Sequence, residues 1–181
     1  DEYRAVNLNI QAILALKIKT LFTLLNQKYH NLAYAELLKA NIDLVEVLTG
    51  YVDPSLRQYQ PLPITSRECD IFYRSRHYPY WLGSLAQERV FIAEKFNENA
   101  SRYDLKIDVS LEESDRIYGA AWLQALASSK AVLGTESGAS IWDVDGAIER
   151  ETKRFLSKQP HATFDATSKA VLSQFEGNIL Y

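Results

Sequence analysis

Short apolar stretches with strand composition alternate with helical stretches along this chain, and the alternation restricts the folds that it can adopt. In the first third, residues 18–25 and 42–48 are predicted to be buried strands, with a helical stretch at 34–39 between them. A strand, a helix and a second strand in this order make a βαβ unit with two parallel strands. The sequence therefore predicts an α/β protein with parallel sheets.

The same alternation continues through the rest of the chain. Further strands are predicted at 69–73, 105–109 and 131–133. Helices are predicted at 3–16, 85–99, 115–127, 147–157 and 164–175, with Ser84, Ser114 and Thr163 as N-caps of the second, third and fifth. Strands thus alternate with helices on both sides of a stretch that lacks both patterns.

That stretch, residues 52–66, contains Pro54, Pro61 and Pro63 and is predicted to be a linker. A chain of 181 residues is long enough for one large domain or two small ones. With the linker as a boundary, residues 1–60 and 61–181 are predicted to form two α/β domains, each with a parallel sheet.

Composition places the chain among ordinary globular proteins, with 47% hydrophobic and 24% charged residues. A net charge of −3 argues against a nucleic-acid partner. No apolar run is long enough to span a bilayer and no signal peptide is evident, which predicts a soluble cytoplasmic protein and leaves peripheral membrane contact open. The absence of methionine and the apolar end at 179–181 lead us to expect part of a longer protein.

Cysteine and histidine are too sparse to predict a disulfide framework or a metal centre. Cys69 is the single cysteine, which fits a reducing compartment. The three histidines, His30, His77 and His161, are far apart in the sequence. We therefore predict no metal site.

Ligands of open α/β sheets bind beyond the carboxyl ends of the strands. In this chain those ends are followed by the loops 74–83, 110–116 and 134–140. The sequence therefore directs the search for a site to these three loops.

The first loop carries arginines and aromatic residues directly after a predicted strand. Arg74 and Arg76 are two residues apart, and guanidinium groups suit the oxygens of a diphosphate. Tyr78, Tyr80 and Trp81 can stack on a base or a sugar. The alternative is that the arginines are solvated and the rings pack against the next helix.

In the second loop, Glu112, Glu113 and Asp115 are predicted to stabilise the positive end of a helix rather than to form a site. Arg116 and Tyr118 follow them and are candidates for side chains that face a cleft. Tyr78 of the first loop is a candidate of the same kind.

The third loop, GTESGAS, combines small residues that let backbone N–H groups approach a ligand. It lacks the lysine of a Walker A loop, and Glu136 replaces the serine of a nucleophile elbow. Gly134, Thr135, Glu136 and Ser137 are candidates for ligand contact, with Glu136 accepting from sugar hydroxyls. A tight structural turn is the alternative.

The following segment IWDVDG resembles the first motif of haloacid-dehalogenase-type phosphatases, in which Asp143 would be the nucleophile and Asp145 the general acid/base. Two features argue against this: Ala147 stands where that motif has threonine, and residues 138–140 are poor strand formers. We predict instead that both aspartates shape a turn and cap the helix that begins near Ala147.

A family resemblance covers most of the chain. The segments CDIFYRSRHYPYWLGSLAQER, LKIDVS and EESDRIYGAAWLQALASSKAVLGTESGASIWDVDG resemble bacterial glycosyltransferases of GT-B type from surface-polysaccharide clusters, as do DEYRAVN and VLTGYV. The resemblance implies two Rossmann-like domains, both incomplete here. Residues 1–60 match the later part of the acceptor-side domain, and 61–181 match the first and central parts of the donor-binding domain.

The resemblance also implies a function, namely sugar transfer from a nucleotide-sugar donor to a glycan or lipid-linked acceptor without a metal or other cofactor. It places Arg74 and Arg76 near the donor diphosphate and the loop from Gly134 on the same ligand side. The general base is not identified, although Asp1 and Glu2 are weak candidates. Because the family's Ser-Pro-Arg segment and glutamate-bearing helix are missing, we expect this chain alone to be inactive. A non-catalytic module that binds a nucleotide or glycan is the alternative.

Overall fold

The computed structural model describes residues 6–48, 50–136 and 138–177. By their contacts, the described residues form two compact units. Unit 1 lies within 1–51, 79–86 and 138–181, and unit 2 within 52–78 and 87–137. The predicted domain boundary at 60/61 differs from this division, because residues 79–86 and 138–181 pack with the first part of the chain. That boundary stays a prediction.

Unit 1 contains the βαβ unit predicted from the first third of the sequence. Strands β1 and β2 are parallel, and Phe22 is the register partner of Val45. The elements from the first helix to the second strand are α1 (Val6–Ala15), β1 (Thr20–Thr23), α2 (His30–Ala33), α3 (Ala35–Lys39) and β2 (Asp43–Glu46). Strand β1 is shorter than predicted because the Thr23 hydroxyl accepts a hydrogen bond from the Leu25 N–H (3.0 Å), which turns the chain.

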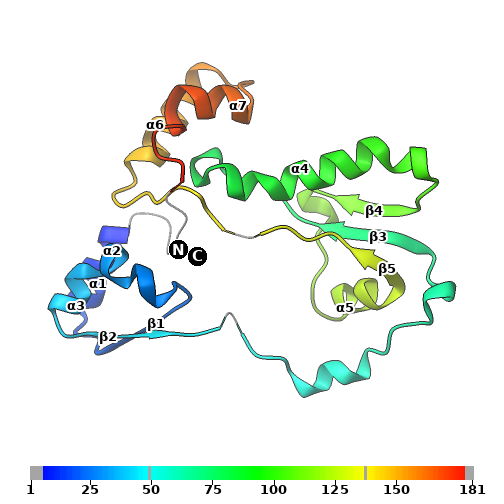
Figure 1. The fold of residues 1–181 in the computed structure, drawn as a ribbon, viewed down its shortest axis with the longest axis horizontal. Coiled ribbons are helices and arrows are strands. Elements are labelled where there is room, and N and C mark those ends of the chain that lie inside the picture. The colour runs from blue at the N-terminus through cyan, green and yellow to red at the C-terminus, as the bar shows by residue number, and fades with distance from the viewer. Residues whose placement is uncertain (1–5, 49, 137, 178–181) are drawn as a thin grey trace. The chain divides into compact units, whose positions relative to one another are not determined.

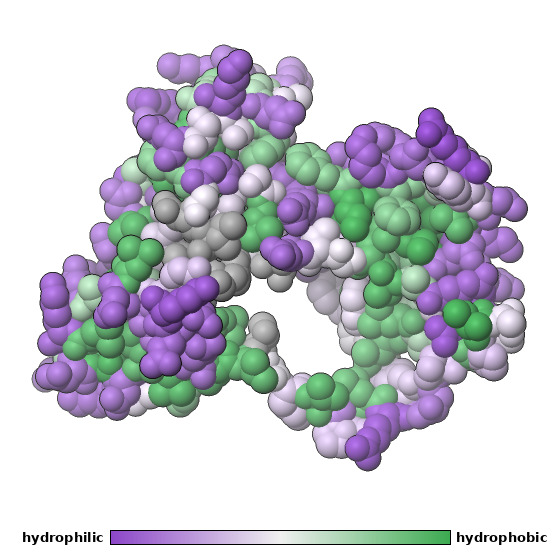
Figure 2. All heavy atoms as spheres, in the orientation of Figure 1, coloured by the Kyte–Doolittle hydropathy of each residue, from purple (hydrophilic) through white to green (hydrophobic). Residues whose placement is uncertain are grey.

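The first core of unit 1 lies between α1 and the elements of this βαβ unit. Val6 and Ile10 of α1 pack with Leu37, which is fully buried, and with Ile42. One face of the two-stranded sheet remains exposed at Phe22 and its register partner. Figure 2 shows hydrophobic residues gathered over the part of unit 1 that holds β1 and β2.

A second core of unit 1 is formed by later parts of the chain. Trp81, Ile141, Ile148 and Leu172 pack together, and all four are buried. The helices that contribute are α6 (Ala147–Lys158) and α7 (Phe164–Thr167), which continues as a π-helical turn (Ser168–Leu172). The prediction that Thr163 caps the last helix is confirmed, since its hydroxyl accepts from the N–H of Ala166.

Unit 2 is built on a three-stranded parallel sheet in the order β4-β3-β5. Its strands are β3 (Cys69–Arg74), β4 (Ile107–Ser110) and β5 (Ser129–Val132), and helix α5 (Gly119–Ser128) connects β4 to β5. Helix α4 (Ser84–Asn99) begins in unit 1 and continues into unit 2. Phe72 contacts Trp122 of α5 at 5.4 Å, and the hydroxyl of Tyr73 donates to the carbonyl of Arg89 in α4. Because successive residues of a strand point to opposite faces, the two helices cover opposite faces of the sheet (Figure 1).

Two of the predicted helix starts are wrong. Ser84 is the first residue of α4 rather than its cap: Leu85 N–H donates to the Ser140 hydroxyl and Ser84 N–H to Glu176 Oε1. Helix α5 begins at Gly119 and not after Ser114, which lies in a short 3₁₀ turn. Side chains distant in sequence hold the first turn of α4, and Arg74 holds the segment before α5 by donating to the carbonyl of Asp115. Local capping rules do not include such partners.

The proline-rich stretch 52–66 forms two 3₁₀ turns, Pro54–Gln58 and Ile64–Ser66, without a strand or an α-helix. The structure is therefore α/β with two small parallel sheets, as the sequence predicts. In the described part of the chain, no helix has both the length and the apolar character needed to cross a bilayer.

Candidate functional site

A pocket of about 610 Å³ lies in unit 2 at the carboxyl edge of the three-stranded sheet. This volume is within the range of small-molecule sites. The end of each strand and the segment after it supply most of the lining. These residues are Arg74 at the end of β3 with Ser75, Arg76 and Tyr78 after it; Arg116, Ile117, Tyr118 and Gly119 after β4; and Gly134 and Thr135 after β5. Tyr73, Arg89 and Trp122 complete the lining. The fold thus brings the three predicted loops together, because parallel strands end at the same edge.

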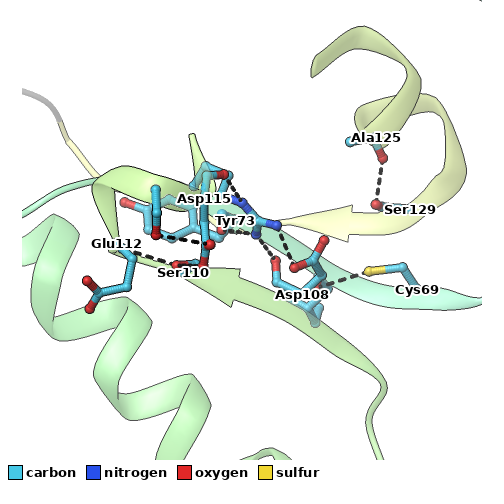
Figure 3. Close-up of polar contacts among 11 residues, drawn as sticks. Cys69, Tyr73, Asp108, Ser110, Glu112, Asp115, Ala125 and Ser129 are labelled. Carbon is cyan, nitrogen blue, oxygen red and sulfur yellow. Dashed lines mark hydrogen bonds and ion pairs between the residues drawn. The ribbon is translucent and has the colours of Figure 1, made fainter. Parts of the chain in front are cut away.

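Arg74 is held by the protein itself. Its guanidinium is mostly buried and donates to Asp108 Oδ1 (2.6 Å) and to the carbonyls of Asp108, Asp115 and Tyr73. Asp108 and Asp115 are among the residues labelled in Figure 3. Four of the five N–H donors of an arginine are therefore used within the protein, and the charge is paired. Arg74 ties β3 to β4 and to the loop after β4.

Arg116 is also paired, but it is more accessible. Its Nη1 donates to Glu113 Oε1 at 2.7 Å, and its guanidinium carbon lies 5.1 Å from the centre of the Tyr118 ring. The hydrogen bond to Glu113 raises the pKa of the Arg116 guanidinium above its usual value. Glu113 therefore orients a charged group at the pocket instead of capping a helix as predicted.

Arg76 and Arg89 have no carboxylate partner in the residues that the structure describes. Both are in contact with Tyr78, whose ring centre lies 5.2 Å from the guanidinium carbon of Arg76 and 4.9 Å from that of Arg89. Arg89 Nη1 also donates to the Tyr78 hydroxyl at 2.6 Å. These two arginines retain most of their donors for a ligand.

Arg89 was not among the residues singled out in the sequence. It lies on α4 at the helical spacing of the apolar residues Leu85, Ile92 and Phe96. An arginine at an inward position of an amphipathic helix was the available signal, since such a charge requires a partner or a cavity.

The third loop contributes only in part. Gly134 and Thr135 line the pocket, and a Cβ placed on Gly134 would meet no atom within 4 Å. Glu136 is exposed and does not line the pocket, while Ser137 lies outside the described residues. The first two positions of this loop therefore remain candidates for ligand contact.

Two aromatic residues of the first loop do not reach the pocket. Trp81 is buried in the second core of unit 1, and Tyr80 contacts the ring of Phe164 at 5.5 Å. The prediction that they stack on a ligand is wrong. Both rings pack instead, although against residues 141–172 and not against the next helix as the alternative had it. His77 is exposed at the surface.

The aspartates of the phosphatase-like motif are helix caps, as predicted. Asp143 is buried, with its two oxygens accepting from the N–H groups of Ile148 (3.2 Å) and Glu149 (2.9 Å). Asp145 accepts from the N–H of Ala147 at 2.9 Å. Because both oxygens of Asp143 are engaged and shielded, this carboxylate is not placed to attack a phosphate ester.

The charge of the pocket contrasts with that of the chain. Four arginines line it and, within the described part of the chain, no acidic residue does, whereas the whole protein carries a net charge of −3. Tyr78, Tyr118 and Trp122 add flat aromatic surfaces. Guanidinium groups beside aromatic rings suit a ligand that joins an anionic group to a planar or sugar ring.

Comparison with known proteins adds no relative: the chain matches no protein-family model, no curated protein and no solved structure. Among residues 6–48, 50–136 and 138–177, no three His, Cys, Asp or Glu side chains come close enough to hold a metal ion. Asp1 and Glu2, the weak candidates for a general base, lie outside these ranges. The case for a function therefore depends on the pocket of unit 2.

Proposed function

We propose that this chain is part of a glycosyltransferase that moves a sugar from a nucleotide-sugar donor to a glycan or lipid-linked acceptor. The pocket of unit 2 is the donor site in this proposal. The observation that carries it is the set of four arginines at the carboxyl edge of a parallel sheet, two of which, Arg76 and Arg89, have no carboxylate partner among the described residues. Ligands of open α/β sheets bind at this edge.

The chemistry of the donor fits these side chains. Cleavage of the sugar–phosphate bond leaves a nucleoside diphosphate whose negative charge has to be stabilised, and positioned guanidinium groups supply this without a metal. Arg76 and Arg89 have free donors for the diphosphate, while Arg116 adds a third positive charge. The start of α5 at Gly119, where Tyr118 provides no side-chain cap, adds the positive end of a helix dipole.

We further propose that the two parallel sheets are parts of two Rossmann-like domains of GT-B type. The βαβ unit of unit 1 and the β4-β3-β5 sheet of unit 2 are compatible with such halves. The acceptor would bind to the domain that contains unit 1. Peripheral contact with a membrane would give this domain access to a lipid-linked acceptor.

Titration calorimetry with the diphosphates of uridine, guanosine and adenosine tests the donor site. We expect one of them to bind, and we expect the double variant Arg76→Ala/Arg89→Ala to weaken binding by about ten-fold or more, because each charged hydrogen bond contributes about 1.5–3 kcal/mol. The control is Arg102→Ala, an exposed arginine of unit 2 that does not line the pocket. Equal affinities of the double variant and the control would remove the donor-site assignment.

A non-catalytic nucleotide- or glycan-binding module is the second candidate. The observation that favours it is the lack of any carboxylate or imidazole among the described residues that line the pocket, so that the lining offers no general base. Nucleoside diphosphate release from nucleotide-sugars separates the two functions. If the protein binds nucleotide-sugars but releases no nucleoside diphosphate, whether or not a glycan acceptor is present, the non-catalytic binding module is favoured.

A further inference from the structure

We infer that Tyr78 acts as a displaceable substitute for an anionic ligand: its hydroxyl and ring occupy Arg89 and Arg76, and a phosphate group that enters the pocket replaces them. This inference rests on the proposed function in that both place an anion beside Arg89. It goes further by assigning Tyr78 the role of a positioning residue that sets the affinity of the site.

The argument begins with the four arginines of the pocket. Arg74 and Arg116 are paired with the carboxylates of Asp108 and Glu113. Arg89 instead has a neutral partner, since its Nη1 donates to the hydroxyl of Tyr78 at 2.6 Å. An anion adds a charge–charge attraction that the neutral hydroxyl does not supply, so it competes well for Arg89, whereas at the paired arginines it has to displace a carboxylate.

The same tyrosine also engages the second unpaired arginine. The guanidinium carbon of Arg76 lies 5.2 Å from the centre of the Tyr78 ring, and that of Arg89 lies 4.9 Å from it. Both arginines are therefore held near one ring. A single side chain thus keeps in place the two cations that the ligand requires.

The backbone around Tyr78 allows its side chain to move alone. Residues 75–79 form no helix or strand, and the carbonyl of Tyr78 accepts a hydrogen bond from Gln87 Nε2 of α4 at 3.1 Å. With the main chain fixed at this point, rotation about the side-chain bonds is enough to withdraw the phenol from the arginines. Its displacement costs the Arg89–Tyr78 hydrogen bond, which lowers the apparent affinity for the anion.

The variant Tyr78→Phe removes this competition but keeps the ring. We expect inorganic pyrophosphate, measured by calorimetry with the whole chain, to bind the variant about 2- to 10-fold more tightly than the parent protein, which is the equivalent of one net hydrogen bond. Tyr103→Phe is the matched control, because this exposed tyrosine of unit 2 does not line the pocket. It should leave the affinity unchanged.

A double-mutant cycle tests whether the effect passes through Arg89. In an Arg89→Ala background, Tyr78→Phe should give no gain, because the hydroxyl then has no guanidinium to occupy. Arg89→Lys, which keeps the charge but lacks the planar fork, should also weaken pyrophosphate binding. Circular dichroism and the melting temperature establish that each variant is folded.

The possible results separate this inference from the proposed function. Weaker or unchanged binding by Tyr78→Phe, a gain that persists in Arg89→Ala, or no pyrophosphate binding by any variant would each overturn the inference. If nucleoside diphosphates bind no better than pyrophosphate while Tyr78→Phe still tightens binding, the role of Tyr78 stands and the nucleotide-sugar assignment fails. If nucleoside diphosphates bind but pyrophosphate does not, the nucleotide-sugar assignment stands and the role of Tyr78 fails.

Discussion

At the scale of single residues, the arginines of the pocket divide into two roles. Arg74 supports the structure of unit 2, since it joins two strands and a loop through four hydrogen bonds. Arg76 is exposed, and its only recorded contact in the described residues is with the ring of Tyr78. Two arginines that are equivalent in the sequence are therefore expected to respond differently to substitution.

We expect Arg74→Ala to lower the free energy of unfolding by about 1–3 kcal/mol, because the Asp108 carboxylate loses its partner and three carbonyl groups lose a donor. Arg76→Ala, the matched control, should change it by less than about 0.5 kcal/mol. Urea unfolding followed by circular dichroism measures both. Equal stability losses would contradict the division of roles.

At the scale of elements, the caps of the helices distinguish local from distant control. Helix α6 is capped by Asp143 and Asp145, which lie just before it in the sequence. Helix α4 is instead capped by Ser140 and Glu176. Gly83, at φ +85°, immediately precedes it, and an added Cβ would collide with the hydroxyl of Ser140.

We expect Asp143→Ala to destabilise the protein by about 1–2 kcal/mol or more, because two buried N–H groups of α6 lose their acceptor. Asp143→Asn should cost less, since its amide oxygen still accepts one bond. Thermal unfolding compares the variants. Neither is expected to alter phosphate-ester hydrolysis, and magnesium-dependent activity that disappears in Asp143→Asn would restore the phosphatase interpretation.

At the scale of the whole molecule, the two units have separate cores, and the residues that line the arginine pocket all belong to unit 2. A ligand that binds only the folded form of unit 2 stabilises that unit. Hydrogen exchange in the presence of a bound nucleoside diphosphate should therefore slow in peptides from 69–76 and 107–119 and remain unchanged in 20–46. Protection confined to 20–46 would place the ligand in unit 1.

Much of the secondary structure was predictable because its causes are local. Apolar spacing over a few residues indicated α1 and α6, and the strand–helix–strand order indicated the parallel pair β1 and β2. The cap formed by Asp143 and Asp145 was predictable for the same reason, since the accepted N–H groups lie two to six residues further along the chain.

The sequence by itself thus determined the α/β class, the parallel pairing and the loops that contribute to the lining of the pocket. Only the tertiary structure decided what each arginine does, because its partner comes from another element: Asp108 of β4 for Arg74, and Tyr78 of the loop after β3 for Arg89. Periodicity and capping act over a few residues, whereas ion pairs and pockets depend on which segments the sheet brings together. Distant partners of this kind leave little trace in a single sequence, so the unpaired cations of the pocket emerged only from the fold.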